Sequence, residues 1–234
     1  MAKTTFKKPV VKAAEEETQE LLKTPNEPAT IEAYNGADGS GWGVEDIRIP
    51  YFSLVQKTGQ LSNDFDPGGF VFNKELSVGD GKDPIELTVL RADKYFVEDV
   101  PYDPDIRPKR FNTKTEFENE GFSLDYNSEM RVKEAAELVV LVPVEEGRAT
   151  LINGTDFYVR ALWVIQSSAF NTVGRTVATA MLAGHLRDGV HFGKWALTSE
   201  LRSNKSMSWY VPIIRSMGRH GNDTAEFIEK QCIL

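Results

Sequence analysis

The sequence predicts a mainly β domain with one internal helix. Several segments of strand length alternate apolar and polar side chains or are continuously apolar, as half-buried and buried strands do. The most regular of these are residues 85–91, 136–143 and 157–165. A later segment, residues 171–184, instead repeats apolar side chains at helical spacing.

The strands are expected to begin soon after residue 44. Pro50 has no N–H, so the segment that contains it is confined to a sheet edge or a strand start. Clusters of Gly, Pro and Asp predict the turns between segments. In order, we expect strands at residues 47–56, 70–72 and 85–91, the last extended by 94–97, with turns at 66–69 and 78–84.

The second half of the chain contains the longest predicted strand and the helix. Alternation over residues 157–165 places Phe157, Val159, Ala161, Trp163 and Ile165 on one face and Tyr158, Arg160, Leu162 and Val164 on the other. After the helix, two strands at residues 192–199 and 207–215 are joined by a turn at 203–206, and residues 223–230 form a short terminal helix.

The chain divides into three predicted parts. Residues 1–43 lack a core pattern and end in four glycines within residues 35–43, so we expect a flexible N-terminal arm and linker. Residues 44–222 form the folded domain. Within it, residues 98–130 are acidic, aromatic and rich in turn residues, and they predict a long loop excursion. Residues 223–234 form a C-terminal tail helix.

The order of these elements is that of an OB-fold-like five-stranded barrel. An OB-fold is a partly open, five-stranded Greek-key barrel, and its single helix lies between the third and fourth strands. The predicted helix at residues 171–184 has this position. Other small β-barrels and sandwiches share the same order of elements, so they stay open as alternatives.

Positive charge is concentrated in one part of an otherwise acidic chain. The chain carries a formal net charge of −8, but residues 151–220 contain eight Lys and Arg against three Asp and Glu. This block is therefore +5, and the rest of the chain is −13. A basic groove on an acidic body would explain the contrast, and so would a chance fluctuation over a solvated surface.

Aromatic and basic side chains interleave through the last predicted hairpin, residues 191–212. Aromatic faces stack on nucleic-acid bases, and Lys and Arg neutralise phosphates. For each aromatic residue alone, packing in the core is the competing interpretation. The candidate nucleic-acid-binding residues are Tyr158, Arg160, Arg175, Lys194, Trp195, Arg202, Lys205, Trp209, Tyr210 and Arg215.

Signals for catalysis or for a cofactor are poor. The glycines at residues 36–43 lack the Lys-Ser/Thr of a phosphate-binding loop. His185, His191, His220 and the single cysteine, Cys232, match no metal-ligand spacing. No run of 18 apolar residues predicts a membrane span, and no signal peptide is recognisable. We therefore expect a non-catalytic protein of the cytoplasm without a metal or cofactor.

Two short patterns carry a resemblance to a known family. Residues 44–56, Val-Glu-Asp-Ile-Arg-Ile-Pro-Tyr-Phe-Ser-Leu-Val-Gln, precede Pro-Gly-Gly-Phe at residues 67–70, and Trp195-Ala-Leu-Thr-Ser precedes Trp209-Tyr-Val-Pro. These patterns resemble the opening and the close of bacteriophage OB-fold single-stranded DNA-binding proteins. Many of those proteins end in a strongly acidic tail that recruits partners, whereas residues 223–234 are only mildly acidic.

The resemblance implies a sequence-independent single-stranded DNA-binding protein that supports phage DNA replication or recombination in the host cytoplasm. Single-stranded DNA is the expected partner, and replication or recombination proteins and further copies of the chain remain open as others. One alternative is a virion or scaffold protein whose arm serves assembly. A second is a Mg²⁺-dependent nucleic-acid enzyme that uses carboxylates of residues 98–130.

Overall fold

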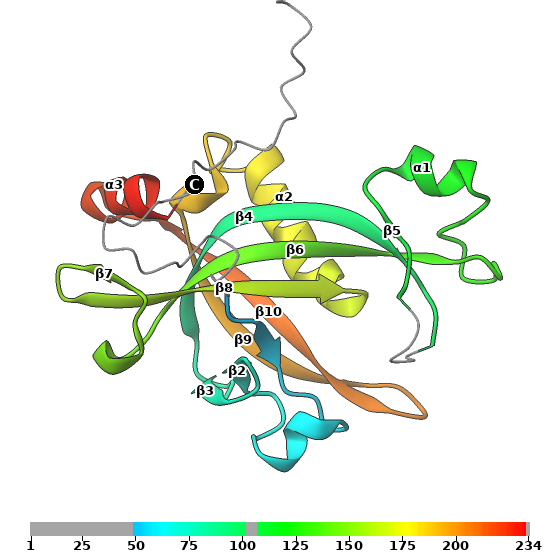
Figure 1. Cartoon of the computed structure of the whole chain (residues 1–234), viewed down its shortest axis with the longest axis horizontal. Coiled ribbons are helices and arrows are strands. Elements are labelled where there is room, and N and C mark those ends of the chain that lie inside the picture. Colours follow the sequence, from blue (N-terminus) through cyan, green and yellow to red (C-terminus); the bar gives the residue numbers. More distant parts are fainter. Residues whose placement is uncertain (1–48, 102–106, 233–234) are drawn as a thin grey trace, which may run out of the picture. The chain divides into compact units, whose positions relative to one another are not determined.

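The computed structural model describes residues 49–101 and 107–232, which belong to a compact unit that begins at Ile49. The predicted arm and glycine-rich linker, residues 1–43, lie outside the described residues. The prediction of a mainly β fold is confirmed, because two antiparallel sheets and a few helices make up the described chain (Figure 1).

The larger sheet has the strand order β10-β9-β4-β6-β8-β7, and a short strand, β5, pairs with β4. β4, β6 and β8 follow one another as a meander, and β9 returns beside β4. This is the 4-1-2-3 order of a Greek key, to which β10 adds a fifth long strand. The bounds are β4 (Ile85–Glu98), β5 (Arg110–Phe111), β6 (Val132–Pro143), β7 (Leu151–Asn153), β8 (Asp156–Gln166), β9 (Gly193–Ser203) and β10 (Ser208–Arg219).

Neither sheet closes on itself, so the barrel expected from an OB-like order is not confirmed. β8 and β10 do not pair with each other. A second sheet, in the order β1-β2-β3, contacts both of them through β1 and the residues that flank it. Its strands are β1 (Phe52–Leu54), β2 (Phe70–Phe72) and β3 (Leu76–Gly79).

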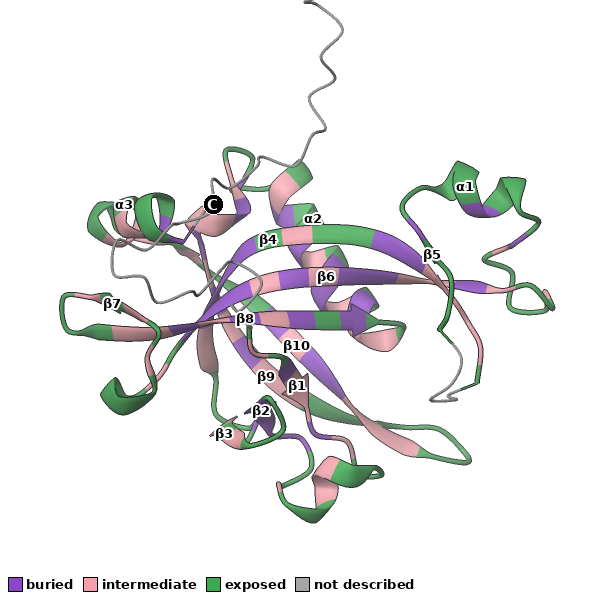
Figure 2. Cartoon of the chain, in the orientation of Figure 1, coloured by how far each residue is buried: buried purple, intermediate pink, exposed green. Residues whose placement is uncertain are grey.

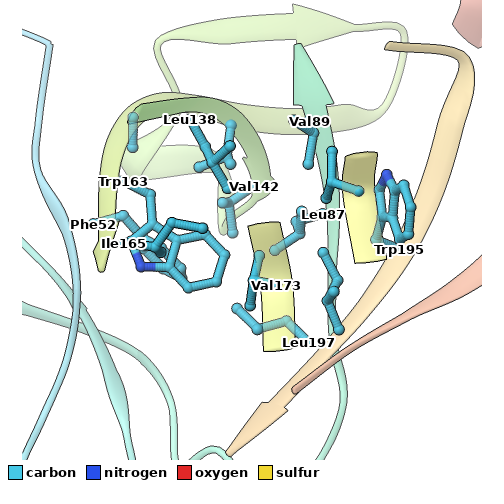
Figure 3. Close-up of a cluster of buried hydrophobic side chains, with 14 of the residues drawn as sticks. Phe52, Leu87, Val89, Leu138, Val142, Trp163, Ile165, Val173, Trp195 and Leu197 are labelled. Atoms are coloured by element: carbon cyan, nitrogen blue, oxygen red, sulfur yellow. The ribbon is translucent and has the colours of Figure 1, made fainter. Parts of the chain in front are cut away.

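One helical segment packs inside the curved main sheet. It begins as a π-helical turn, η4 (Phe170–Gly174), and continues as α2 (Arg175–Leu182), in the connection between β8 and β9 where the sequence predicts a helix. Val173 and Val177 of this segment pack with the inward side chains of the long strands, including Trp163 and Trp195 (Figure 3). The predicted alternation of β8 is confirmed, since Val159, Ala161, Trp163 and Ile165 are all buried.

The predicted loop excursion is more ordered than its sequence indicates. Its described part contains β5 and a short helix, α1 (Lys114–Asn119), at the far end of the β4–β6 ribbon (Figure 1). Thr113 caps this helix, and Glu116 completes the capping box. A second, small hydrophobic core lies in this region and consists of Phe96, Phe111, Phe117, Phe122 and Val132.

The C-terminal helix is part of the domain rather than a separate tail. α3 (Asn222–Gln231) lies where the sequence predicts it, and Ile228 is fully buried against Leu90 and Leu141 of the main sheet. The outward face of α3 remains exposed, as Figure 2 shows. Three short 3-10 turns complete the fold: η2 (Gln60–Asn63), η3 (Glu146–Arg148) and η5 (Val190–Phe192).

Candidate nucleic-acid interface

A groove of about 890 Å³ lies between the end of β8, β1 and the start of β10. We call it the β8–β10 groove. It occupies the place where a closed barrel would pair these two strands. The side chains that line it come from four segments of the chain: residues 52–58, 163–166, 168–169 and 206–212.

The residues before and after β1 bridge the two unpaired strands. The Leu162 N–H of β8 donates to the Pro50 carbonyl at 2.8 Å. On the other side, the Gln56 side-chain amide donates to the Tyr210 carbonyl and accepts from the Tyr210 N–H, each at 2.9 Å. Gln56 thus takes the place of a neighbouring strand at this position of β10. Two residues further along the same edge, Pro212 has no N–H to offer a partner strand.

Tyr210 is held over a glycine. A Cβ atom on Gly68 would lie 2.6 Å from Tyr210 Cε1, so only glycine allows the ring this close. Gly68 also has φ +96°, which disfavours other residues. Ser199 Oγ of β9 donates to the Gly68 carbonyl at 2.7 Å. The ring therefore has a defined seat at the wall of the groove.

The lining combines aromatic and uncharged polar side chains. Of its aromatic residues, Phe52 and Trp163 are buried, whereas Trp209 and Tyr210 are only partly buried. None of the described lining residues is Asp or Glu, and Lys57 is the cation among them. Lys57 Nζ donates to Ser208 Oγ at 3.2 Å. The remaining polar lining residues are Ser53, Gln56, Thr58, Gln166, Ser168, Ser206 and Ser208.

Four of the sequence-predicted site residues are found at or beside this groove. Trp209 and Tyr210 line it, and Lys205 immediately precedes the lining residue Ser206. Arg202 lies directly opposite Trp209 in the β9–β10 ladder. Among the described residues, no carboxylate lies within ion-pairing distance of Lys57 or Lys205. Arg202 Nη2 lies 3.7 Å from an oxygen of the Glu200 carboxylate.

The other predicted residues lie away from the groove, and one of them, Trp195, cannot stack on a base as predicted. Trp195 is fully buried in the core and has no exposed face on which a base could stack (Figure 3). Tyr158 stacks on Phe227 of α3, with ring centroids 6.1 Å apart. Arg160 Nη1 donates to the Cys232 carbonyl at 3.4 Å. Both therefore belong to the α3 contact rather than to the groove.

The remaining basic candidates are largely compensated by carboxylates. Lys194 pairs with Glu86 at 2.7 Å, and Arg175 pairs with Glu134 at 3.0 Å. Arg215 is exposed on β10 beyond the lining residues. The +5 charge of residues 151–220 therefore overstates the field at the surface, because partners such as Glu86 and Glu134 come from outside that block.

Residues on the β1 side of the groove were not found by sequence reasoning. Gln56 ends both the predicted strand at residues 47–56 and the motif at residues 44–56, but neither pattern marked Gln56 or Lys57 as a binding residue. Their role depends on tertiary contacts with β10, which lies 154 residues later in the chain. The Pro-Gly-Gly turn at residues 67–69 was recognisable, but the seat that Gly68 offers to Tyr210 was not.

Among residues 49–101 and 107–232, no helix is long and apolar enough to cross a membrane. The same described residues contain no group of three or more His, Cys, Asp or Glu side chains placed to hold a metal ion. Comparison of the chain with protein-family models, curated proteins and solved structures found no match.

Proposed function

We propose that this chain binds single-stranded nucleic acid, DNA in particular, in the β8–β10 groove and does so without catalysis. The observation that carries the proposal is the lining of the groove. Two partly exposed aromatic residues, Trp209 and Tyr210, line a hollow whose lining contains no carboxylate, although the chain as a whole is acidic. Bases have π-faces that stack on such side chains regardless of sequence.

The geometry favours an unpaired strand over a duplex. The bases of a duplex are stacked and paired, so their faces are not free to contact Trp209 and Tyr210. Lys57 lines the groove, Arg202 lies opposite Trp209 in the β9–β10 ladder, and Lys205 precedes the lining residue Ser206; these cations would supply positive charge for phosphates. The hydroxyl and amide groups of the lining offer hydrogen bonds to base edges without selecting one base.

The biological role that fits this binding mode is strand coating during phage DNA replication or recombination. The resemblance of residues 44–56, 67–70, 195–199 and 209–212 to phage single-stranded DNA-binding proteins supports that role. The partly open Greek-key order of the main sheet is compatible with it.

The test is fluorescence anisotropy with a labelled oligothymidine and a duplex of equal length at one salt concentration, with and without Mg²⁺. We expect tighter binding of the single strand and an intact oligonucleotide under both conditions. Trp209→Ala should weaken binding by about 1–3 kcal/mol. Tyr126→Ala is the matched control, since Tyr126 is an exposed aromatic on the loop after α1.

Equal affinity for the duplex, or equal loss in both variants, would overturn the proposal. Mg²⁺-dependent cleavage of the oligonucleotide would contradict the non-catalytic part of it.

A further inference from the structure

A three-residue ion-pair cluster lies on the inner face of the main sheet. One oxygen of the Glu134 carboxylate, on β6, is 2.6 Å from Lys94 Nζ of β4, and the other is 3.0 Å from Arg175 Nη2 of α2. Lys94 Nζ also lies over the rings of Phe96 and Phe170, 5.0 and 5.4 Å from their centroids. Two cations therefore share a single carboxylate.

An irregularity in β4 brings Lys94 to this face. The pairing of β4 with β6 shifts between Val89 and Arg91, so one residue is added on the β4 side. Val89 packs in the main core before the shift, and Ala92 packs against the same core after it. Lys94 follows Ala92 at the strand period of two and reaches the Phe170 ring.

The cluster begins where the β8–β10 groove ends. Gln166, Ser168 and Ala169 line the groove. Gln166 pairs with Ala135, the neighbour of Glu134, and the Ser167 N–H donates to the Glu134 carbonyl at 3.3 Å. Phe170, the ring under Lys94, directly follows Ala169. A nucleic-acid strand that leaves the groove at this end would contact the ion-pair cluster next.

The cations of the cluster remain accessible. The Lys94 and Arg175 side chains are 51% and 63% exposed, while Glu134 is 24% exposed. Partial burial of the Glu134 carboxyl opposes its ionisation, but the hydrogen bonds and charges of Lys94 and Arg175 hold its pKa below the ordinary value. The carboxylate thus stays ionised at neutral pH and presents two anionic oxygens to two cations, as one phosphate would.

We propose that Lys94 and Arg175 form a binding site for a phosphate of the bound strand, and that Glu134 occupies this site in the free protein. The proposal rests on the proposed function and extends it with a phosphodiester site beyond the groove. Exchange of the carboxylate for a phosphate keeps both cations paired. Glu134 therefore lowers the affinity for long oligonucleotides. It leaves the affinity for short oligonucleotides, which fill only the groove, unchanged.

The test compares Glu134→Gln with Glu137→Gln. Glu137 lies on the same strand but at a position of opposite parity, and it pairs with Arg110 at 3.3 Å. Its side chain is also 24% exposed. Both substitutions remove one negative charge from β6, so a difference between them reports position rather than net charge.

Affinity is measured by anisotropy with oligothymidines of about 4 and about 12 nucleotides, lengths within the range that single OB-type sites cover. For the longer strand, Glu134→Gln should bind roughly fivefold more tightly at about 0.1 M salt, and the log–log salt slope should steepen by about 0.7, the value of one phosphate contact. Glu137→Gln should leave both quantities nearly unchanged. Adding Lys94→Ala to Glu134→Gln should remove most of the gain.

Three outcomes separate this inference from the proposed function. If wild-type protein binds and Trp209→Ala weakens it, but Glu134→Gln and Glu137→Gln behave alike, the phosphate site is refuted and the groove stands. An equal gain for the short and long strands would also refute the site. If wild-type protein binds neither strand, the proposed function itself fails.

Discussion

Substitution of Gly68 by alanine tests whether the seat of Tyr210 matters for binding. At φ +96°, an alanine is strained by about 1–2 kcal/mol. Its Cβ would also lie 2.6 Å and 2.9 Å from two atoms of the Tyr210 ring and 3.1 Å from Ser199 Oγ. Contacts below 3.0 Å force something to move, and both contacts below that distance are with the Tyr210 ring. The substitution therefore displaces Tyr210 from the wall of the groove.

Gly218 provides a matched control for the strain. Its φ is +102°, close to that of Gly68, but a Cβ there would meet nothing within 4 Å. Backbone strain should cost both alanine variants about 1–2 kcal/mol of stability, which corresponds to a fall in Tm of about 2–8 °C for a domain of this size, and the displaced ring should add to the loss in Gly68→Ala. Only Gly68→Ala should also weaken oligothymidine binding, by up to the roughly 1–3 kcal/mol of one stacked base.

The assay pairs thermal unfolding with anisotropy at a temperature where both variants are folded. If Gly68→Ala is folded and binds like wild type, the position of Tyr210 is irrelevant and the argument for its seat fails. If Gly218→Ala weakens binding as much, the effect is a general one of backbone strain.

Three further predictions concern the core, the salt dependence and the pH dependence. Trp195→Ala should cost roughly 3–5 kcal/mol of unfolding free energy, measured in urea, whereas Trp209→Ala should cost clearly less; equal costs would contradict their different burial. Lys205→Ala should reduce the log–log salt slope of oligothymidine binding by about 0.7, and an unchanged slope would remove Lys205 from the interface. Burial lowers the pKa of His220 from its ordinary value of 6.5, so the folded state favours the neutral ring. Stability should therefore be fully present above pH 6.5 and fall as the pH drops towards the folded-state pKa. His220→Gln should flatten the Tm between about pH 7 and 5, and an unaltered profile would contradict this linkage.

The long strands and the internal helix were predictable because each has a periodic signal of its own. In β8, alternation alone separates Trp163, which faces the core, from Val164, which is exposed. The small core after β4 was not predictable, since its four phenylalanines are spaced without a period and the turn residues between them suggest a loop. Its order comes from contacts among the aromatic rings.

The candidate site was only partly predictable for a related reason. Interleaved aromatic and basic residues correctly drew attention to the β9–β10 hairpin, but composition does not tell which aromatic side chain points inward. Trp195 and Trp209 look alike in the sequence, and only the register of the sheet buries the first. Ion pairs such as Lys194 with Glu86 join residues far apart in the chain, so local charge counts miss them.

The bridge between β1 and β10 has a consequence for the order of folding. Gln56 and Tyr210 are 154 residues apart, so their hydrogen bonds close one of the longest loops in the domain. Long loops are costly to close before other contacts exist, whereas β9 and β10 form a local hairpin. We therefore expect the hairpin to form early and the β1 segment to attach to it after the rate-limiting step. Loss of the Gln56 amide would then accelerate unfolding and leave the refolding rate nearly unchanged.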